Sequence, residues 1–101
     1  MKKKIYVHVA DDHKILIEGI IAVINTDKDI EIKDYSLTGQ EVVDWFDKKG
    51  NKADVLILDI TMPILDGFEV LRHFNKKQIN QKVIILSSYD DIKIVQEMLS
   101  L

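Results

Sequence analysis

The sequence contains no cysteine, one proline and four glycines among its 101 residues. Without cysteine, disulfide scaffolds and thiolate metal sites are excluded. No apolar run approaches the roughly 18 residues that suggest a membrane span, and the apolar stretch after the lysine-rich start is too short for a secretory signal. Fourteen basic and 17 acidic residues give a formal charge of −3, which argues against a general electrostatic grip on nucleic acid. We expect one cytoplasmic domain.

Short apolar runs alternate along the chain with segments of helical periodicity. Runs rich in β-branched residues predict strands at 5–10, 30–35, 55–58 and 83–86. After each run, apolar residues recur at helical spacing and predict a helix. These residues are Leu16, Ile17, Ile20, Ile21 and Ile24, then Val42, Val43 and Phe46, then Phe68, Leu71 and Phe74, and finally Val95, Met98 and Leu99. Such alternation with short connections predicts an α/β domain with a parallel sheet.

The pattern within each strand predicts the order of the sheet. Residues 55–58 are continuously apolar, which is typical of a strand buried on both faces, and together with the apolar strand at 5–10 they suit the middle of the sheet. Residues 83–86 form a second continuously apolar strand. Residues 30–35 alternate with a period of two, which suits an edge strand. These patterns favour the strand order 2-1-3-4, with a topological switch point between the first and third strands. Ligands of such sheets bind beyond the carboxyl ends of the strands at that point.

Other local signals have structural interpretations. Thr38 and Glu41 match a capping box at the start of the second helix. His8 lies within a predicted central strand, and we interpret it as a core histidine with one nitrogen hydrogen-bonded. We interpret the neighbouring Trp45 and Phe46 as helix packing.

Carboxylates follow two strands that the predicted order makes adjacent. Asp11 and Asp12 come directly after the first strand, and Asp59 comes directly after the third. Two such charges about 4 Å apart repel by about 4 kcal/mol at an effective dielectric constant near 20. A hard divalent cation, Mg²⁺ or Mn²⁺, would offset that repulsion. Alternatively, each Asp is structural, and Asp12 caps the helix that begins near His13.

A hydroxyl and a carboxylate extend this prediction to phosphoryl chemistry. Ser87 ends the fourth strand and could donate to a phosphoryl oxygen. Asp59 beside a metal ion could act as a nucleophile toward phosphorus and form an acyl phosphate.

Four segments together resemble the response-regulator receiver domain: 9–13 (VADDH), 58–63 (LDITMP), 66–67 (DG) and 86–88 (LSS). The Asp-Asp-His form, with Glu18-Gly19 in the first helix, is most similar to the LuxR-type (NarL/FixJ) subfamily. The resemblance implies a flavodoxin-like, doubly wound parallel sheet with a fifth strand and a fifth helix. The chain stops in or just after the fourth helix. We therefore expect residues 1–101 to be a receiver domain that is incomplete at its C-terminus, with no effector domain.

The resemblance also implies roles for individual residues. Asp59 would accept a phosphoryl group from a histidine kinase. Asp12 would ligate Mg²⁺ together with a carboxylate oxygen of Asp59 and the backbone carbonyl of Thr61, while Asp11 would act through a metal-bound water. Ser87 would be the switch hydroxyl that turns toward the phosphoryl group, and Ser88 the small residue that leaves access to the site.

The loop after Asp59 both matches the family and departs from it. Pro63 and Gly67 are expected to shape this loop, Pro by fixing φ and Gly by permitting backbone angles that other residues avoid. Ile64 stands where the family commonly has Gly, which we expect to alter loop flexibility. The family's fifth strand ends in a Lys, for which this chain has no counterpart.

The resemblance further implies partners. We expect a histidine kinase as phosphodonor and a helix-turn-helix effector in the parent protein, with no direct nucleic-acid binding and no membrane contact by this chain. Without a fifth strand and helix, apolar surface and the edge of the fourth strand should be exposed, which favours a homo-oligomer.

Two other function classes compete with this interpretation. One is a receiver that signals without phosphate. The other is a phosphohydrolase with Asp59 as nucleophile, but haloacid-dehalogenase-type enzymes carry a second Asp two positions later, where this chain has Thr61.

Overall fold

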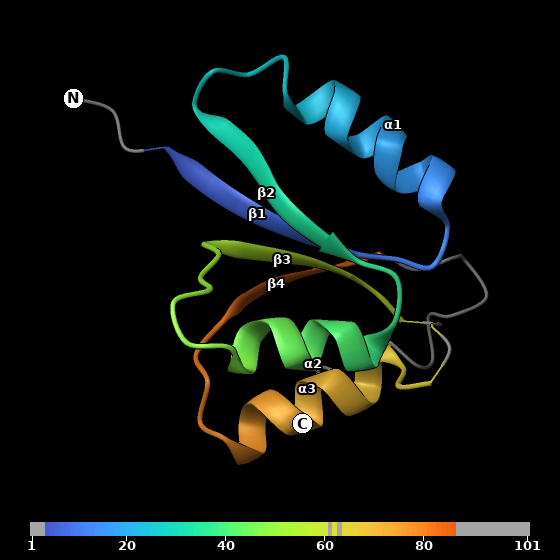
Figure 1. Ribbon diagram of the computed structural model, residues 1–101, viewed down its shortest axis with the longest axis vertical. Helices are drawn as coiled ribbons and strands as arrows, with labels where there is room; N and C mark the ends of the chain where they lie inside the picture. Colours follow the sequence, from blue (N-terminus) through green and yellow to red (C-terminus); the bar gives the residue numbers. More distant parts are fainter. Residues whose placement is uncertain (1–3, 61, 63, 87–101) are drawn as a thin grey trace.

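The computed structural model describes residues 4–60, 62 and 64–86, which form alternating strands and helices (Figure 1). In chain order they are β1 (Ile5–Ala10), α1 (Lys14–Ile24), β2 (Ile30–Ser36), α2 (Gly39–Asp47), β3 (Val55–Asp59), α3 (Gly67–Lys76) and β4 (Lys82–Leu86). All seven were predicted, and the strand bounds agree with the prediction to within one residue at each end. The predicted fourth helix lies outside the described residues.

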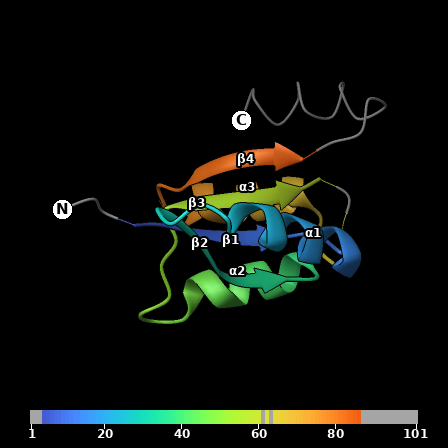
Figure 2. The same ribbon diagram turned by 90° about the horizontal axis from the view of Figure 1, so that it is seen from above.

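The strands form one parallel sheet in the order β2-β1-β3-β4. Figure 2 shows them side by side, with β2 and β4 at the two ends of the described sheet. The predicted α/β fold, strand order and switch point between β1 and β3 are therefore confirmed. The carboxyl ends of β1 and β3 are adjacent, which places the residues that follow them at one edge of the sheet.

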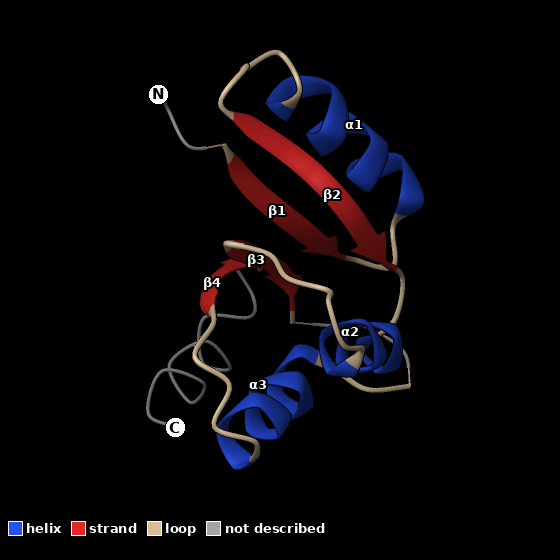
Figure 3. Ribbon diagram, turned by 60° about the vertical axis from the view of Figure 1, so that its left-hand side comes forward, coloured by secondary structure: helices blue, strands red, loops and turns tan. Residues whose placement is uncertain are grey.

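The two faces of the sheet have separate cores, because successive side chains of a strand point to opposite faces. On one face, Val7 and Val9 of β1 pack against Ile17 of α1. On the other face, a larger cluster packs under α2 and α3; it contains Ala10, Val42, Val43, Leu56, Leu58, Met62, Val70 and Phe74. Figure 3 shows α1 on one side of the sheet and α2 and α3 on the other. Each buried Val or Leu contributes roughly 1.5–3 kcal/mol through burial.

The predicted period-two alternation of β2 breaks in its middle. Pairing with β1 passes from Val7–Ile32 to His8–Asp34, so Lys33 has no opposite residue. This irregularity reverses the faces of the residues that follow, because one extra residue shifts the side-chain pattern by half a period. Asp34 therefore lies on the face of His8 and not on the face of Ile32.

A buried histidine and two aromatic rings pack between β1 and α2. His8 is fully buried, and its ring centroid lies 4.3 Å from that of Trp45 and 5.6 Å from that of Phe46. Its Nε2 lies 2.7 Å from the Ser36 Oγ. Both sequence interpretations are confirmed: His8 is a core histidine with one nitrogen hydrogen-bonded, and the two aromatic residues pack a helix onto the sheet.

The sequence predicted a capping box at the start of α2, but the reciprocal capping box in the structure lies at the start of α3. At α2, the Thr38 hydroxyl accepts the Glu41 N–H, but the Glu41 carboxylate accepts from Leu37 and not from the capping residue. A reciprocal capping box forms instead at α3, between Asp66 and Glu69. Each of these caps satisfies N–H groups that a helix start leaves without intrahelical partners.

Several apolar side chains are exposed on the face that carries α1. Ile15 and Val23 of α1 are 86% and 71% exposed, and Ile84 of β4 is 55% exposed. Among the described residues, no helix is both long and apolar enough to cross a membrane.

Candidate metal centre

Three carboxylates and one imidazole meet at the carboxyl ends of β1 and β3. One potential ligand atom from each of Asp11, Asp12, His13 and Asp59 lies within 4.8 Å of all the others. Strands β1 and β3 pair up to Ala10–Leu58, so the residues after each end emerge side by side. The predicted gathering of Asp11, Asp12 and Asp59 is thus present in the structure.

Asp11 is the most tightly held member of the cluster. It is only 2% exposed. Its Oδ1 accepts the backbone N–H of His13 at 2.8 Å, and its own N–H donates to the carbonyl of Ser36 at 3.1 Å. Both its backbone and its side chain are therefore fixed before any ligand arrives.

Asp12 does not cap α1. The capping position is His13, and no side chain makes a capping hydrogen bond there. The Asp12 side chain is instead about one-third exposed, with Oδ1 3.1 Å from the His13 Nδ1. The capping role expected as an alternative for Asp12 is therefore wrong, and its partly exposed carboxylate lies beside the His13 imidazole.

His13 is a member of the cluster, although the sequence did not identify it as a site residue. Its Nδ1 lies 2.8 Å from the Asp11 Oδ1 and contacts Asp12 as well. The hydrogen bond to Asp11 raises the pKa of His13, and the negative charges of Asp12, Asp11 and Asp59 raise it further. The position of His13 directly after the Asp-Asp pair was the available signal in the sequence.

Asp59 is fixed by the strands around it. It ends β3, pairs in register with Leu86 of β4 and is 8% exposed. The first residue of α3, Gly67, donates its N–H to the carbonyl of Ile60 at 2.9 Å and packs against this strand end. Gly67 is needed for this close approach and not for an unusual φ, since it is not among the residues with positive φ. The expected reason for this glycine was therefore wrong.

The loop after β3 contains a strained residue. Ile64 has φ of 71°, a left-handed conformation that β-branched residues rarely adopt, and its side chain is 78% exposed. The family's preference for Gly here matches this backbone conformation. Thr61, Pro63, Ser87 and Ser88, to which the sequence also assigned roles, lie outside the described residues.

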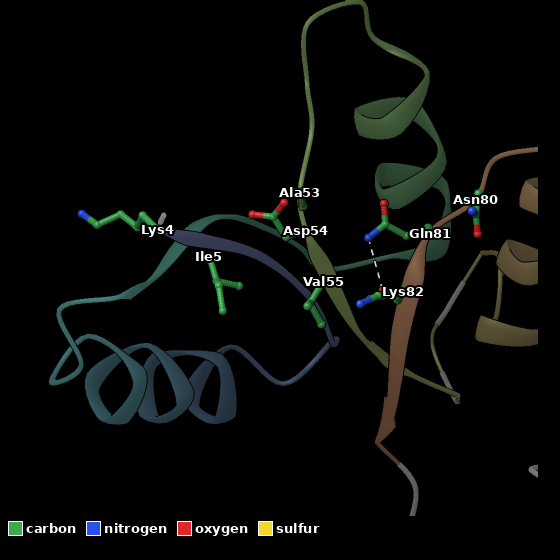
Figure 4. A pocket seen from close by; sticks show the side chains of 8 residues that line it. All are labelled: Lys4, Ile5, Ala53, Asp54, Val55, Asn80, Gln81 and Lys82. Carbon is green, nitrogen blue, oxygen red and sulfur yellow. Dashed lines mark hydrogen bonds between the residues drawn. The ribbon is translucent and has the colours of Figure 1, made fainter. Parts of the chain in front are cut away.

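A separate pocket of about 510 Å³ lies at the opposite ends of the strands (Figure 4). Two of its charged side chains are engaged elsewhere: Asp54 accepts the Tyr6 N–H at 2.8 Å, and Lys4 pairs with Glu31 at 3.1 Å. Among the residues that the structure describes, Asp54 is the one carboxylate that lines this pocket, so the pocket does not gather carboxylates as the acidic cluster does.

Comparison with known proteins identifies the family of this chain. A model of the response regulator receiver domain matches residues 7–101. The chain belongs to that family. This membership favours the receiver interpretation over a phosphohydrolase, and the transcriptional regulators among its relatives confirm the resemblance to the LuxR-type (NarL/FixJ) subfamily.

Two curated relatives are bacterial regulators. Transcriptional regulatory protein DegU of Brevibacillus brevis is 29% identical over 98 residues, which cover 97% of this chain and 41% of that protein. The uncharacterized transcriptional regulatory protein YxjL of Bacillus subtilis is 31% identical over 96 residues, which cover 95% of this chain and 43% of that protein. The receiver chain thus spans less than half the length of either relative.

Solved receiver structures share the fold. The Francisella response regulator 1452 receiver domain has a TM-score of 0.83 and 32% identity, covering 96% of this chain and 77% of that one. A receiver in the CheX–CheY–BeF₃–Mg²⁺ complex from Borrelia burgdorferi has a TM-score of 0.80 and 27% identity, covering 97% of this chain and 72% of that one.

Proposed function

We propose that this receiver accepts a phosphoryl group on Asp59 from a histidine kinase, with Mg²⁺ bound at the acidic cluster. The observation that carries the proposal is the gathering of three carboxylates, from Asp11, Asp12 and Asp59, at one edge of the sheet. Two of them are nearly buried, and gathering buried carboxylates without a cation is unfavourable. Membership of the receiver family supports the same reading.

The chemistry of the donor set fits Mg²⁺. Carboxylate oxygens, a backbone carbonyl and water are the ligands that this ion prefers, and it keeps several waters when one or two carboxylates hold it. Asp12 and Asp59 would bind it directly, with the carbonyl of Thr61, and Asp11 would act through a bound water. When bound, Mg²⁺ neutralises the carboxylates and the oxygens of the incoming phosphoryl group. A related receiver from Borrelia burgdorferi is found in a complex that contains Mg²⁺ and BeF₃.

Asp59 is suited to act as the nucleophile. Pairing of β3 with β1 and β4 fixes its backbone, so its carboxylate starts from a defined position. One carboxylate oxygen would attack the phosphorus of a phosphohistidine. The new O–P bond forms as the N–P bond breaks, and the imidazole of the donor leaves with the electron pair. The product is an acyl phosphate on Asp59.

The acyl phosphate would then change the surface that an effector reads. Phosphorylation adds about −1.5 to −2 charge and three strong acceptors, and Ser87 would turn toward them while Ser88 leaves access to the site. The curated relatives are transcriptional regulatory proteins, so we infer that a helix-turn-helix effector in the parent protein contacts DNA. The chain itself carries a net charge of −3 and is not expected to do so.

We also infer that the chain self-associates through the face that carries α1. Ile15 and Val23 expose apolar surface there, and β4 at the end of the described sheet adds Ile84. Exposed apolar surface and the end of a sheet both favour association.

The experiment for phosphoryl acceptance uses a small phosphoramidate donor, with intact mass as the readout. The wild-type protein should gain the mass of one phosphoryl group with Mg²⁺ and lose this reactivity with a chelator. Asp59→Asn should gain none. The matched control is Asp44→Asn, which makes the same change at an exposed site on α2 and should react as the wild type does. Equal labelling of wild type and Asp59→Asn would refute the assignment.

A further inference from the structure

A buried polar pair, His8 and Ser36, lies next to the acidic cluster but outside it. His8 is fully buried in β1, and Ser36 is 2% exposed at the end of β2. The His8 Nε2 and the Ser36 Oγ are 2.7 Å apart. Burying two polar groups is unfavourable unless they hydrogen-bond to each other. Apolar side chains would fill this part of the core without that requirement.

The irregular pairing of β2 creates this hydrogen bond. After the unpaired Lys33, Asp34 stands opposite His8, and Ser36 stands opposite Ala10. With regular pairing, Tyr35 would occupy the position of Ser36, and the Ser36 side chain would not reach His8. Such irregularities re-aim side chains and recur next to functional sites.

Two aromatic side chains also contact the His8 ring. Trp45 packs against it with ring centroids 4.3 Å apart and ring planes tilted by 37°, and the Trp45 Nε1 donates to the Asp34 Oδ2 at 3.0 Å. Phe46 meets the ring edge-on at 5.6 Å. The imidazole is therefore held in one orientation, with Nε2 directed at the hydroxyl of Ser36.

Ser36 also makes a backbone hydrogen bond to Asp11, a member of the acidic cluster. The carbonyl of Ser36 accepts the N–H of Asp11 at 3.1 Å. Ser36 is thus fixed through its side chain by His8 and in turn fixes Asp11 through its backbone. The carboxylate of Asp11 points into the cluster, where its Oδ1 also accepts the N–H of His13.

We propose that His8 and Ser36 are positioning residues for the metal centre. Their side-chain hydrogen bond fixes the end of β2, and the Ser36 carbonyl then fixes Asp11 in the geometry that metal binding requires. This inference rests on the proposed function, because it assigns Asp11 to the Mg²⁺ site. It adds a polar connection that runs from His8 through Ser36 to the acidic cluster, with Trp45 packed against the His8 ring.

The first test measures the dissociation constant of Mg²⁺ by calorimetry, for the wild type and for two variants. Ser36→Ala and His8→Leu should each weaken binding about tenfold, the lower end of the loss seen when an outer-sphere partner of a metal ligand is removed. The double variant should lose no more than either single one, because the two residues act through one hydrogen bond.

A control separates positioning from general destabilisation. Val7→Ala removes buried side-chain atoms from the same strand, but on the opposite face. It should lower the melting temperature and leave the Mg²⁺ dissociation constant unchanged, with all constants measured well below the melting transitions. Wild-type affinity in both Ser36→Ala and His8→Leu, or an equal loss in Val7→Ala, would overturn the proposal.

A second readout needs no metal. Hydrogen exchange of the Asp11 amide, followed by NMR, should be faster in Ser36→Ala and in His8→Leu than in the wild type, relative to the amides of β3. In Val7→Ala the ratio should stay at the wild-type value. A wild-type protein that binds no Mg²⁺ refutes the proposed metal site, and this exchange ratio still decides whether His8 and Ser36 position Asp11. An unchanged ratio in Ser36→Ala contradicts the positioning role.

Discussion

Gly67, the first residue of α3, lies against the carbonyl oxygen of Asp59. A Cβ at position 67 would stand 2.6 Å from that oxygen and 3.0 Å from the Cα of Ile60. Both atoms belong to the backbone, so neither can move without shifting the end of β3. The position of the proposed phosphoacceptor therefore depends on the absence of a side chain eight residues later.

Gly67→Ala should consequently impair stability and phosphoryl acceptance together. The backbone must shift to accommodate the new Cβ, which should lower the free energy of unfolding by about 1–3 kcal/mol, as overpacking of a protein core does. Displacement of Asp59 should slow labelling by the phosphoramidate. Urea unfolding and the initial rate of labelling measure the two effects.

Gly19→Ala is the matched control for that variant. Gly19 lies inside α1, and a Cβ there would meet no atom within 4 Å. The substitution should stabilise the protein by up to about 1 kcal/mol, because Ala favours a helix interior over Gly. Wild-type stability and labelling in Gly67→Ala would show that the contact between the two backbones does not fix Asp59.

Ile64→Gly should stabilise the protein, although it removes an apolar side chain. Ile64 has φ of 71° and is 78% exposed, so it gains little from packing. A residue with a Cβ in this conformation loses about 1–2 kcal/mol, part of which is offset by the greater chain entropy of Gly when unfolded. We expect a net gain of about 1 kcal/mol in urea unfolding.

Ile64→Ala separates strain from the loss of the side chain. Ala keeps the Cβ and hence the strain, so its unfolding free energy should stay close to that of the wild type. Equal stabilisation by Ala and Gly would show that the backbone conformation at position 64 is not strained.

Acidification should destabilise the protein through His8. Burial lowers the pKa of His8 from 6.5 to about 4, so between these values the unfolded chain binds a proton that the folded chain does not. This contribution to stability is complete above pH 6.5 and is lost as the pH falls toward 4. Over that window it amounts to roughly 3 kcal/mol.

His8→Leu provides the comparison, because it removes the titrating group. Urea unfolding from pH 7 to 4 should show a steeper loss in the wild type than in His8→Leu. Parallel profiles would show that His8 titrates alike in the folded and unfolded states.

A charge on the exposed face of α1 should reduce self-association. Val23 is 71% exposed and borders the apolar surface that Ile15 and Ile20 continue. Val23→Lys should therefore lower the mean mass in light scattering at tens of micromolar. Ala22→Lys adds the same charge at the neighbouring exposed position and should leave the mass closer to that of the wild type. Identical masses in wild type and Val23→Lys would contradict association through this face.

The sheet order and the acidic cluster were predictable because both follow from simple repeating patterns. Continuous apolar runs identified β3 and β4, and the parallel sheet brought Asp11 and Asp59 to one edge. Buried strands and polar residues at their carboxyl ends are properties of single segments, so they can be recognised in one sequence.

Features that depend on contacts between segments were missed. The irregular pairing at Lys33 has no local signature and is visible only in the register between two strands. The hydrogen bond of His8 to Ser36 follows from that register, so the partner of the histidine could not be predicted from the sequence. The close approach of Gly67 to Asp59 likewise depends on two elements. In the sequence, a glycine required for close packing cannot be distinguished from a glycine required for a turn.

Locating the phosphoryl group in the protein shows directly whether Asp59 is the phosphoacceptor. After phosphorylation with Mg²⁺, reduction by borohydride converts an aspartyl phosphate to homoserine, which peptide mass spectrometry assigns to one residue. We predict homoserine at position 59 in the wild type and none in Asp59→Asn. Homoserine at Asp11 or Asp12, or a phosphoryl group on His13, would contradict it.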